Sequence, residues 1–256
     1  MKKFLLSLIV ALGFVLPAVA SEEGFPWDKF PAEKMTDMAS LQSGARTFVN
    51  YCLNCHSAAY MRYNRMHDIG LNDAEIKKNL LFATDKVGDT MTINADPVQQ
   101  KEWFGVSPPD LSVIARSRAE PGKGSGADYL YTLWRTFYRD ESRPTGWNNL
   151  AYPNVAMPHV LWQMQGERRA IYVDEKSEHA GGKTEHRFAG FEQITPGTMS
   201  VREYDETIGN LVAYLQWVGE PAQGKRIRVG VGVLIFLGLL IVFTWRLNAS
   251  YWKTVA

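Results

Sequence analysis

The stretch VNYCLNCHSAAY, Val49 to Tyr60, contains both cysteines of this 256-residue chain. Cys52 and Cys55 are separated by two residues, and His56 follows directly. Such a pair is compatible with a disulfide, a redox dithiol or a metal site. The sequence around the pair distinguishes these possibilities, and it also indicates the kind of fold.

C-x-x-C followed by His is the attachment signature of c-type haem. The spacing lets two thiols add to the two vinyl groups at one edge of a porphyrin, and the adjacent histidine then lies under the iron as an axial ligand. A thioredoxin-like site would follow a strand, and a zinc site needs further ligands although no other cysteine exists. The motif therefore predicts one haem on Cys52, Cys55 and His56.

The residues before the motif favour a helix rather than a strand. Asp37 or Ser40 is a suitable N-cap. At helical spacing, one face then carries Leu41, Ala45, Phe48, Val49 and Cys52.

The N-terminus has the features of a signal peptide. Lys2 and Lys3 precede an apolar run, residues 4–16, and Ala18-Val19-Ala20 supplies small residues at a cleavage position. As a helix this run would be only about 20 Å long, shorter than a hydrocarbon core of about 30 Å. We expect residues 1–20 to be removed and the rest to be exported.

A second apolar segment, Val229 to Trp245, contains no charged residue and lacks the polar stripe of an ordinary core helix. Basic residues flank it on both sides, so their count does not set its orientation; export of the N-terminus does. We predict an exported domain over 21–224, a transmembrane anchor over 225–248 and a cytoplasmic tail over 249–256.

The exported domain is acidic. Seven of the 28 Lys and Arg residues lie outside 21–224, whereas all 27 Asp and Glu lie inside it, so its formal charge is −6 with His neutral. An acidic domain on a membrane argues against nucleic acid, and it is compatible either with a basic partner or with solubility alone.

A haem iron also needs a sixth ligand, unless one face stays open. Met157 is favoured because Pro153 and Pro158 stiffen its loop, and because a His–Met pair raises the reduction potential. His159 is the rival by spacing. The other candidates are Met35, Met38, Met61, Met66, Met91, Met164, Met199, His67, His179 and His186.

Further blocks occur in order along the chain. They are MRYNRM after the haem motif, PPDLSVIARSRA (Pro108 to Ala119), ADYLYTLW, YPNVAMP and TMSVREYDETIGNLVAYLQWVGEP (Thr198 to Pro221). With these blocks the chain resembles the cytochrome c1 family, the haem subunit of the quinol–cytochrome c reductase (bc1) complex of bacteria.

The resemblance implies a covalent haem c on Cys52 and Cys55, with His56 and Met157 as axial ligands. It also implies that Arg118 pairs with a haem propionate, since a buried carboxylate needs a charged, bidentate partner.

Arg116 is the neighbouring alternative for this pairing. Pro109 would pack on the haem face and Tyr129 would lie near its edge, although ordinary core packing accounts for both residues as well.

Two features depart from the family. Several members have extra cysteines between the arginine block and the methionine loop. This chain has none there, so no disulfide braces that region. The polar stretch Asp174 to Phe188 contains His179 and His186, for which a solvated hairpin is favoured over a metal pair.

The expected fold is all-α: a cytochrome c-type haem domain with long loops and at most one short hairpin, in HVLWQMQGERRAIYV with its turn at Gly166. Asn72 with Glu75, and Ser200 with Glu203, are predicted capping boxes. After Ser200 an apolar stripe runs through Val201, Tyr204, Ile208, Leu211, Leu215 and Val218.

The function that the resemblance implies is single-electron transfer from the Rieske iron–sulfur protein to a soluble or tethered cytochrome c. The partners would be the cytochrome b subunit, the Rieske protein and membrane lipid, in a dimeric complex at the bacterial inner membrane with the haem domain on the periplasmic side. The chain would be a subunit of an enzyme and would not itself catalyse quinol oxidation.

Two other functions fit the haem motif. One is a stand-alone tethered electron carrier, or the haem subunit of another oxidase or reductase. The other is a haem enzyme or gas sensor with an open iron position.

Overall fold

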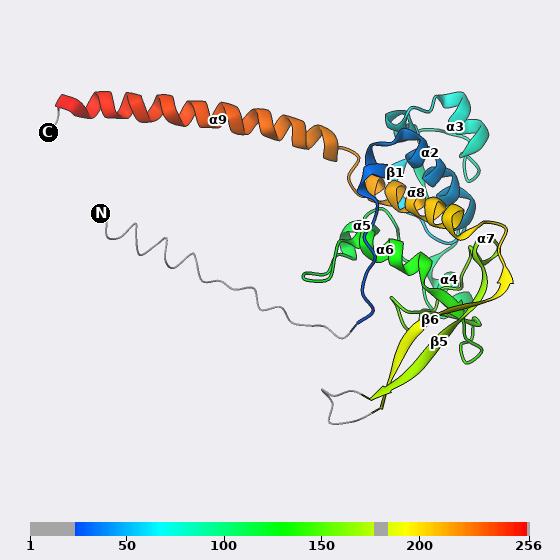
Figure 1. Ribbon diagram of the computed structural model, residues 1–256. Helices are drawn as coiled ribbons and strands as arrows, with labels where there is room; N and C mark the ends of the chain where they lie inside the picture. Colours follow the sequence, from blue (N-terminus) through cyan, green and yellow to red (C-terminus); the bar gives the residue numbers. More distant parts are fainter. Residues whose placement is uncertain (1–23, 177–183, 255–256) are drawn as a thin grey trace.

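In the described part of the chain, a long helix projects from a body of short helices and antiparallel strand pairs (Figure 1). The computed structural model describes residues 24–176 and 184–254. The predicted signal peptide, residues 1–20, lies outside these described residues.

The domain consists mainly of short helices joined by long loops. Its α-helices are α2 (Met38–Thr47), α3 (Asp73–Asn79), α4 (Pro97–Phe104), α5 (Ile114–Ser117), α6 (Gly126–Arg135), α7 (Trp162–Gln165) and α8 (Val201–Gly219). Short 3-10 helices form η1 (Ala32–Thr36), η3 (Tyr63–Ile69) and, after the anchor helix, η4 (Trp252–Thr254), and a widened turn forms η2 (Phe48–Cys52).

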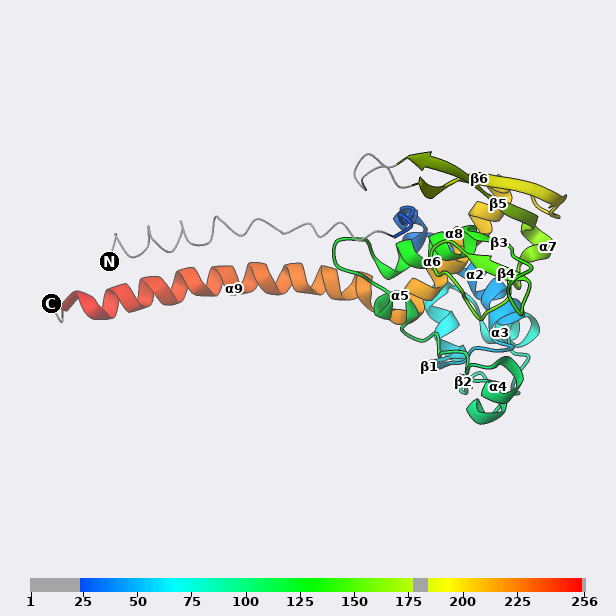
Figure 2. The same cartoon turned by 90° about the horizontal axis from the view of Figure 1, so that it is seen from below.

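Helices α2 and α8 cross at the centre of the domain (Figures 1 and 2). Gly44 permits the close approach, because a Cβ there would lie 2.1 Å from the Asn210 carbonyl oxygen and 2.7 Å from the Tyr214 Cβ. The predicted apolar face before the cysteines is buried against α8, with exposed fractions of 0–5% for Leu41, Ala45, Phe48, Val49 and Cys52. This crossing holds the haem motif at the end of a fixed helix.

The three predicted helix starts are confirmed. Asp37 caps α2 by accepting from the Ala39 and Ser40 N–H groups. Asn72 with Glu75, and Ser200 with Glu203, form reciprocal capping boxes at α3 and α8. The predicted stripe of α8 is buried from Tyr204 to Val218, whereas Val201, in its first turn, is 78% exposed.

The all-α expectation is only approximately right. Three antiparallel pairs lie in the described part of the chain: β1 (Ala58–Arg62) with β2 (Thr90–Met91), β3 (Phe137–Arg139) with β4 (Trp147–Asn149), and β5 (Gly166–Lys176) with β6 (Thr184–Pro196). The β5–β6 pair is a long ribbon at one side of the domain (Figure 1).

The predicted hairpin turn at Gly166 is wrong. Gly166 is the first residue of β5 and pairs with Pro196, at the base of the ribbon. Its φ of +81° and the Thr195 carbonyl oxygen, 2.3 Å from where a Cβ would lie, explain the glycine. The ribbon's far end falls in the polar stretch that was expected to be a solvated hairpin; residues 177–183 lie outside the described residues.

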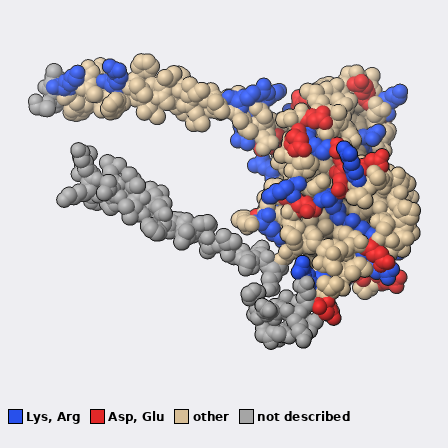
Figure 3. Space-filling model, viewed as in Figure 1, with Lys and Arg blue, Asp and Glu red and all other residues tan. Residues whose placement is uncertain are grey.

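Helix α9 (Gln223–Tyr251) has 29 residues and contains the predicted anchor. Its mean hydropathy reaches 2.5, and none of that apolar window is buried in the domain, so it is a candidate membrane span by length and composition. At 1.5 Å per residue it is about 43 Å long, which exceeds a hydrocarbon core of about 30 Å. Figure 3 shows Lys and Arg at both ends of α9 and none along its middle.

Candidate functional site: a haem attachment motif and the segments packed on it

The two cysteines and His56 lie on one turn at the end of the helix. In η2 the backbone widens, and the Leu53 N–H donates to the Phe48 carbonyl at 2.9 Å. The Cys55 and His56 N–H groups both donate to the Cys52 carbonyl, at 3.1 and 2.9 Å. Widened turns of this kind are frequent at functional sites. These bonds fold the three residues of the motif into one turn at the end of the helix.

Both cysteines are free thiols, so the disulfide alternative is not formed. Cys52 is buried, and burial raises the pKa of its thiol to about 12. A thioether is also uncharged, so attachment to a vinyl group suits this apolar position whereas a thiolate does not.

The ring of His56 is oriented by a neighbouring segment. Its Nδ1 lies 2.7 Å from the Pro109 carbonyl oxygen, which can only accept, so Nδ1–H donates. Burial lowers the pKa of His56, and the Pro109 bond offsets part of that shift. A neutral imidazole fixed in this way presents Nε2 as the nitrogen available to a metal.

The PPDLS segment is hydrogen-bonded to the residues just after the haem motif. The Leu111 N–H donates to the Ser57 carbonyl at 2.8 Å. The Ala59 N–H donates to Asp110 Oδ2 at 2.8 Å, and the Tyr60 N–H donates to Ser112 Oγ at 3.0 Å. Sequence reasoning identified Pro109 but missed the roles of Asp110 and Ser112.

Gln100 was missed as well. Its side chain is 4% exposed, and its amide Nε2 donates to the Cys55 carbonyl at 2.9 Å, which ties α4 to the motif. A glutamine in a polar helix carries no signal for such a contact, whereas the Asp-x-Ser of PPDLS is a recognisable local hydrogen-bonding pattern.

Arg118 is exposed, and its guanidinium lies over two aromatic rings. Its guanidinium carbon is 5.8 Å from the centroid of Tyr129 and 5.9 Å from that of Tyr152. Arg116 instead lies along α8, with its Cγ 3.5 Å from where a Cβ of Gly219 would stand. This geometry favours Arg118 over Arg116 as the arginine of the site, and it brings Tyr129 and the methionine loop to the same guanidinium.

The loop that carries Met157 is anchored by buried asparagines. Asn149 Oδ1 accepts from the Ala151 and Tyr152 N–H groups, at 2.9 and 3.0 Å. Asn148 Oδ1 accepts from the Asn154 N–H at 2.8 Å, where the backbone has a left-handed φ of 63°. Met157 itself is half-buried and packs on the core.

His159, the rival ligand, is enclosed in the core. It is 1% exposed, its ring stacks on Phe137 at 4.7 Å, and its Nε2 lies 2.8 Å from Gln165 Oε1. Burial lowers its pKa to about 3, so the imidazole is neutral. The geometry therefore favours Met157 as the sixth ligand.

The structure brings no second metal site together in the part of the chain that it describes, since no group of three or more His, Cys, Asp and Glu residues could hold an ion there. His179 lies outside the described residues, so the pair of histidines is not tested; His186 lies in β6, opposite Asp174 in the strand register.

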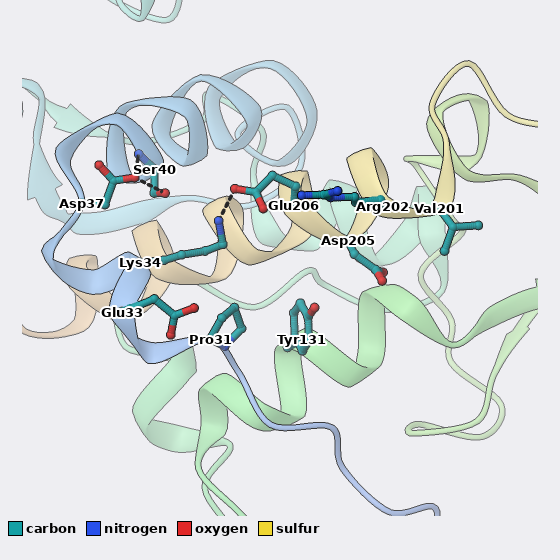
Figure 4. A pocket seen from close by; sticks show the side chains of 10 residues that line it. All are labelled: Pro31, Glu33, Lys34, Asp37, Ser40, Tyr131, Val201, Arg202, Asp205 and Glu206. Carbon is teal, nitrogen blue, oxygen red and sulfur yellow. Dashed lines mark hydrogen bonds and ion pairs between the residues drawn. The ribbon is translucent and has the colours of Figure 1, made fainter.

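A cavity of about 630 Å³ lies between the N-terminal segment and α8 (Figure 4). Charged and polar groups from η1, α2 and α8 line it, and Lys34 reaches Glu206 across it. None of the predicted haem-site residues lines this cavity.

Taken together, the donor set fits one covalently bound haem. Two free thiols on one turn, an imidazole oriented through Nδ1, and a guanidinium facing aromatic rings match what a porphyrin with propionates requires. With the candidate membrane span, this site defines a membrane-anchored c-type cytochrome.

Comparison with known proteins gives the family. The sequence profile of the Cytochrome C1 family matches residues 27–182. The chain is 41% identical to cytochrome c1 of Allochromatium vinosum, over 86% of each chain, and 25% identical to cytochrome c1 of Rhodospirillum rubrum, over 86% of this chain and 83% of the relative. It is also 42% identical to a protein named ammonia monooxygenase gamma subunit in Nitrosomonas europaea, over 100% of this chain and 99% of the relative.

The chain belongs to the cytochrome c1 family. Members carry one covalently bound haem c, are anchored by a C-terminal helix, and form the c-type cytochrome subunit of the bc1 complex.

Proposed function

We propose that this chain carries single electrons from the Rieske iron–sulfur protein to a cytochrome c, within a dimeric bc1 complex that also contains cytochrome b. The observation that carries the proposal is the hydrogen-bonded junction between the haem motif and PPDLS, in a chain of the cytochrome c1 family. The haem domain would lie on the periplasmic side of the bacterial inner membrane.

In this proposal Cys52 and Cys55 would hold the haem covalently, and His56 and Met157 would be the two protein ligands of its iron. When bound, haem c supplies a one-electron couple between ferric and ferrous iron. His56 presents Nε2 because the Pro109 carbonyl holds Nδ1, and the anchored loop offers the thioether of Met157. With both residues bound, the iron would have no free position for a small ligand.

Arg118 would neutralise a haem propionate. Burying a carboxylate is expensive without a charged partner, and a guanidinium can donate two parallel hydrogen bonds to it. Tyr129 supports the guanidinium through its ring, and Pro109 acts through its carbonyl group on His56.

The haem domain's charge of −6 over residues 21–224 supports a basic electron acceptor, because a net field of opposite sign accelerates encounter. The anchor would keep the domain at the lipid surface.

A second candidate is the haem subunit of another oxidase or reductase. The observation that favours it is the relative of 42% identity whose name is ammonia monooxygenase gamma subunit. The haem motif and the anchor serve either assembly, so the partner proteins distinguish them.

The test is purification of the full chain from membranes of its native host, with identification of co-purifying subunits and a redox titration of the spectrum. We expect a two-haem b-type cytochrome and a Rieske protein to co-purify. Their absence, or the presence of monooxygenase subunits in their place, would contradict the proposal.

A further inference from the structure

The residues after Met157 form an anchor of their own. Met157, Pro158 and His159 are consecutive, and the loop runs from β4 to α7 with no regular structure between them. Proline fixes its own φ angle, so the link from Met157 to His159 is short and stiff. Whatever holds His159 in place therefore also limits where the Met157 sulfur can go.

His159 is held on several sides by aromatic rings. Its ring lies parallel to Phe137, at 4.7 Å between centroids and 5° between planes. Trp147 meets it edge-on at 5.1 Å. Trp134 and Tyr204 lie further out, at 6.3 and 6.4 Å. The ring thus connects the loop to β3, β4, α6 and α8.

A hydrogen bond fixes the direction of the ring. Nε2 lies 2.8 Å from Gln165 Oε1 in α7, so Nε2–H donates to the amide oxygen. The His159 carbonyl in turn accepts from the Trp162 N–H at 3.2 Å. Phenylalanine would fill the same space but would leave the amide oxygen without its donor.

We infer that His159 is a positioning residue for Met157: it anchors the loop so that the Met157 thioether stays within reach of the haem iron. The inference rests on the proposed ligation by Met157. A thioether is a neutral ligand with no charge attraction to iron, so its bond persists only while the loop keeps it in place. Asn148 and Asn149 anchor the loop before Met157, and His159 anchors it after.

The experiment compares purified full-length variants His159→Ala, His159→Phe and Met157→Leu with the unmodified protein. His67→Gln is the matched control, because His67 is half-exposed and pairs with Asp73 away from the loop. The readouts are the weak sulfur-to-iron absorption band of the ferric protein, carbon monoxide binding by the ferrous protein, the reduction potential and the melting temperature.

We expect His159→Ala to weaken the sulfur-to-iron band and to raise carbon monoxide binding by about tenfold or more, because truncation of a buried ring shifts local equilibria by at least that factor. His159→Phe should give a smaller change in the same direction. If His159→Ala folds too poorly to purify, His159→Phe decides the question. His67→Gln should leave every readout unchanged.

A lower melting temperature with an unchanged band, potential and carbon monoxide binding would overturn the inference, since His159 would then be structural only. The proposed ligation fails separately, if Met157→Leu leaves the band and the potential unchanged. Loss of the low-spin spectrum in His159→Ala but not in Met157→Leu would make His159 the ligand, and would overturn both statements.

Discussion

At the scale of single residues, the site depends on side chains whose freedom has been removed. His56 is held by a backbone carbonyl, Met157 by a loop pinned at both ends, and Arg118 by two aromatic rings. In the proposed site each group would meet the haem in a position that is already fixed, which would lower the entropy lost on binding and limit reorganisation during electron transfer.

Replacement of Met157 by leucine should lower the reduction potential, on the order of 0.1 V within the range of about 0.8 V that axial ligands span. Leucine fills similar space but has no lone pair, so the ferrous iron should also bind carbon monoxide. Redox titration and a carbon monoxide difference spectrum check both effects. Met164→Leu is the control, because Met164 is also half-buried against the core but lies in α7.

Gly44→Ala should destabilise the domain. Its Cβ would meet the Asn210 carbonyl at 2.1 Å, and the backbone of α8 cannot move without disturbing the core. We expect a loss of about 3 kcal/mol, or a fall of roughly 6–12 °C in melting temperature for a domain of this size. Gly88→Ala is the control, since nothing lies within 4 Å of a Cβ there; equal melting of the two variants would refute the clash.

At the scale of elements, the N-terminal segment is attached to α6 through Asp128. Its carboxylate accepts from the Phe30 N–H at 2.9 Å, from the Ser125 N–H at 2.9 Å and from Lys29 Nζ at 3.1 Å. Burial raises the pKa of Asp128, but these hydrogen bonds together lower it below its ordinary value of 3.8.

A lowered pKa in the folded state means that this carboxylate stabilises the fold above about pH 3.8, and that the contribution is lost as the pH falls through the folded-state pKa. Asp128→Asn should therefore reduce stability at pH 6 more than at pH 3. Denaturant unfolding at the two pH values measures this. Asp85→Asn, at an exposed loop residue, is the control for the substitution itself, and a pH-independent loss in Asp128→Asn would contradict the linkage.

Helix starts and buried faces could be predicted from the sequence because their signals are local. Asp37, Asn72 and Ser200 each act within three residues of themselves. The hairpin turn was wrongly predicted at Gly166 because a glycine indicates only that an unusual backbone conformation is needed at its position. At Gly166 the reason is a strand about thirty residues further on, which no local pattern reveals.

The difference between local signals and contacts made only on folding also applies to the site. The haem motif and the proline-flanked methionine are local patterns, so they could be read directly. The contacts of Asp110, Ser112 and Gln100 depend on which segments meet after folding, as does the enclosure of His159. Sequence spacing alone could not separate His159 from Met157, and Met157 stays the predicted ligand; what the structure adds is the burial of His159 and its hydrogen bond to Gln165.

At the scale of the whole molecule, the haem domain and the anchor are separable. The apolar part of α9 is not buried against the domain, and the core is complete without it. A chain that ends at Ala222 should therefore be exported as a water-soluble cytochrome with an unchanged haem spectrum. Fractionation and spectroscopy test this, with a chain ending at Trp252 as the membrane-bound control; an aggregated or haem-free product would contradict it.

The acidic domain predicts salt-sensitive electron transfer. The rate of transfer to a basic cytochrome c should fall as ionic strength rises above about 0.1 M, where the screening length is about 10 Å. Stopped-flow oxidation measures the rate, with an uncharged small-molecule oxidant as the control. A rate independent of salt would mean that the net charge serves solubility only.

The joint between α8 and α9 has a mechanical consequence. Only Glu220, Pro221 and Ala222 separate the two helices, and Arg226 of α9 bonds to Glu220 at 2.6 Å across the joint. Because α8 also crosses the helix that ends in the haem motif, this joint would keep the iron at a nearly constant height above the lipid. Under the proposed function, electron transfer through a haem held in this way would require the donor and acceptor proteins to be the mobile parts.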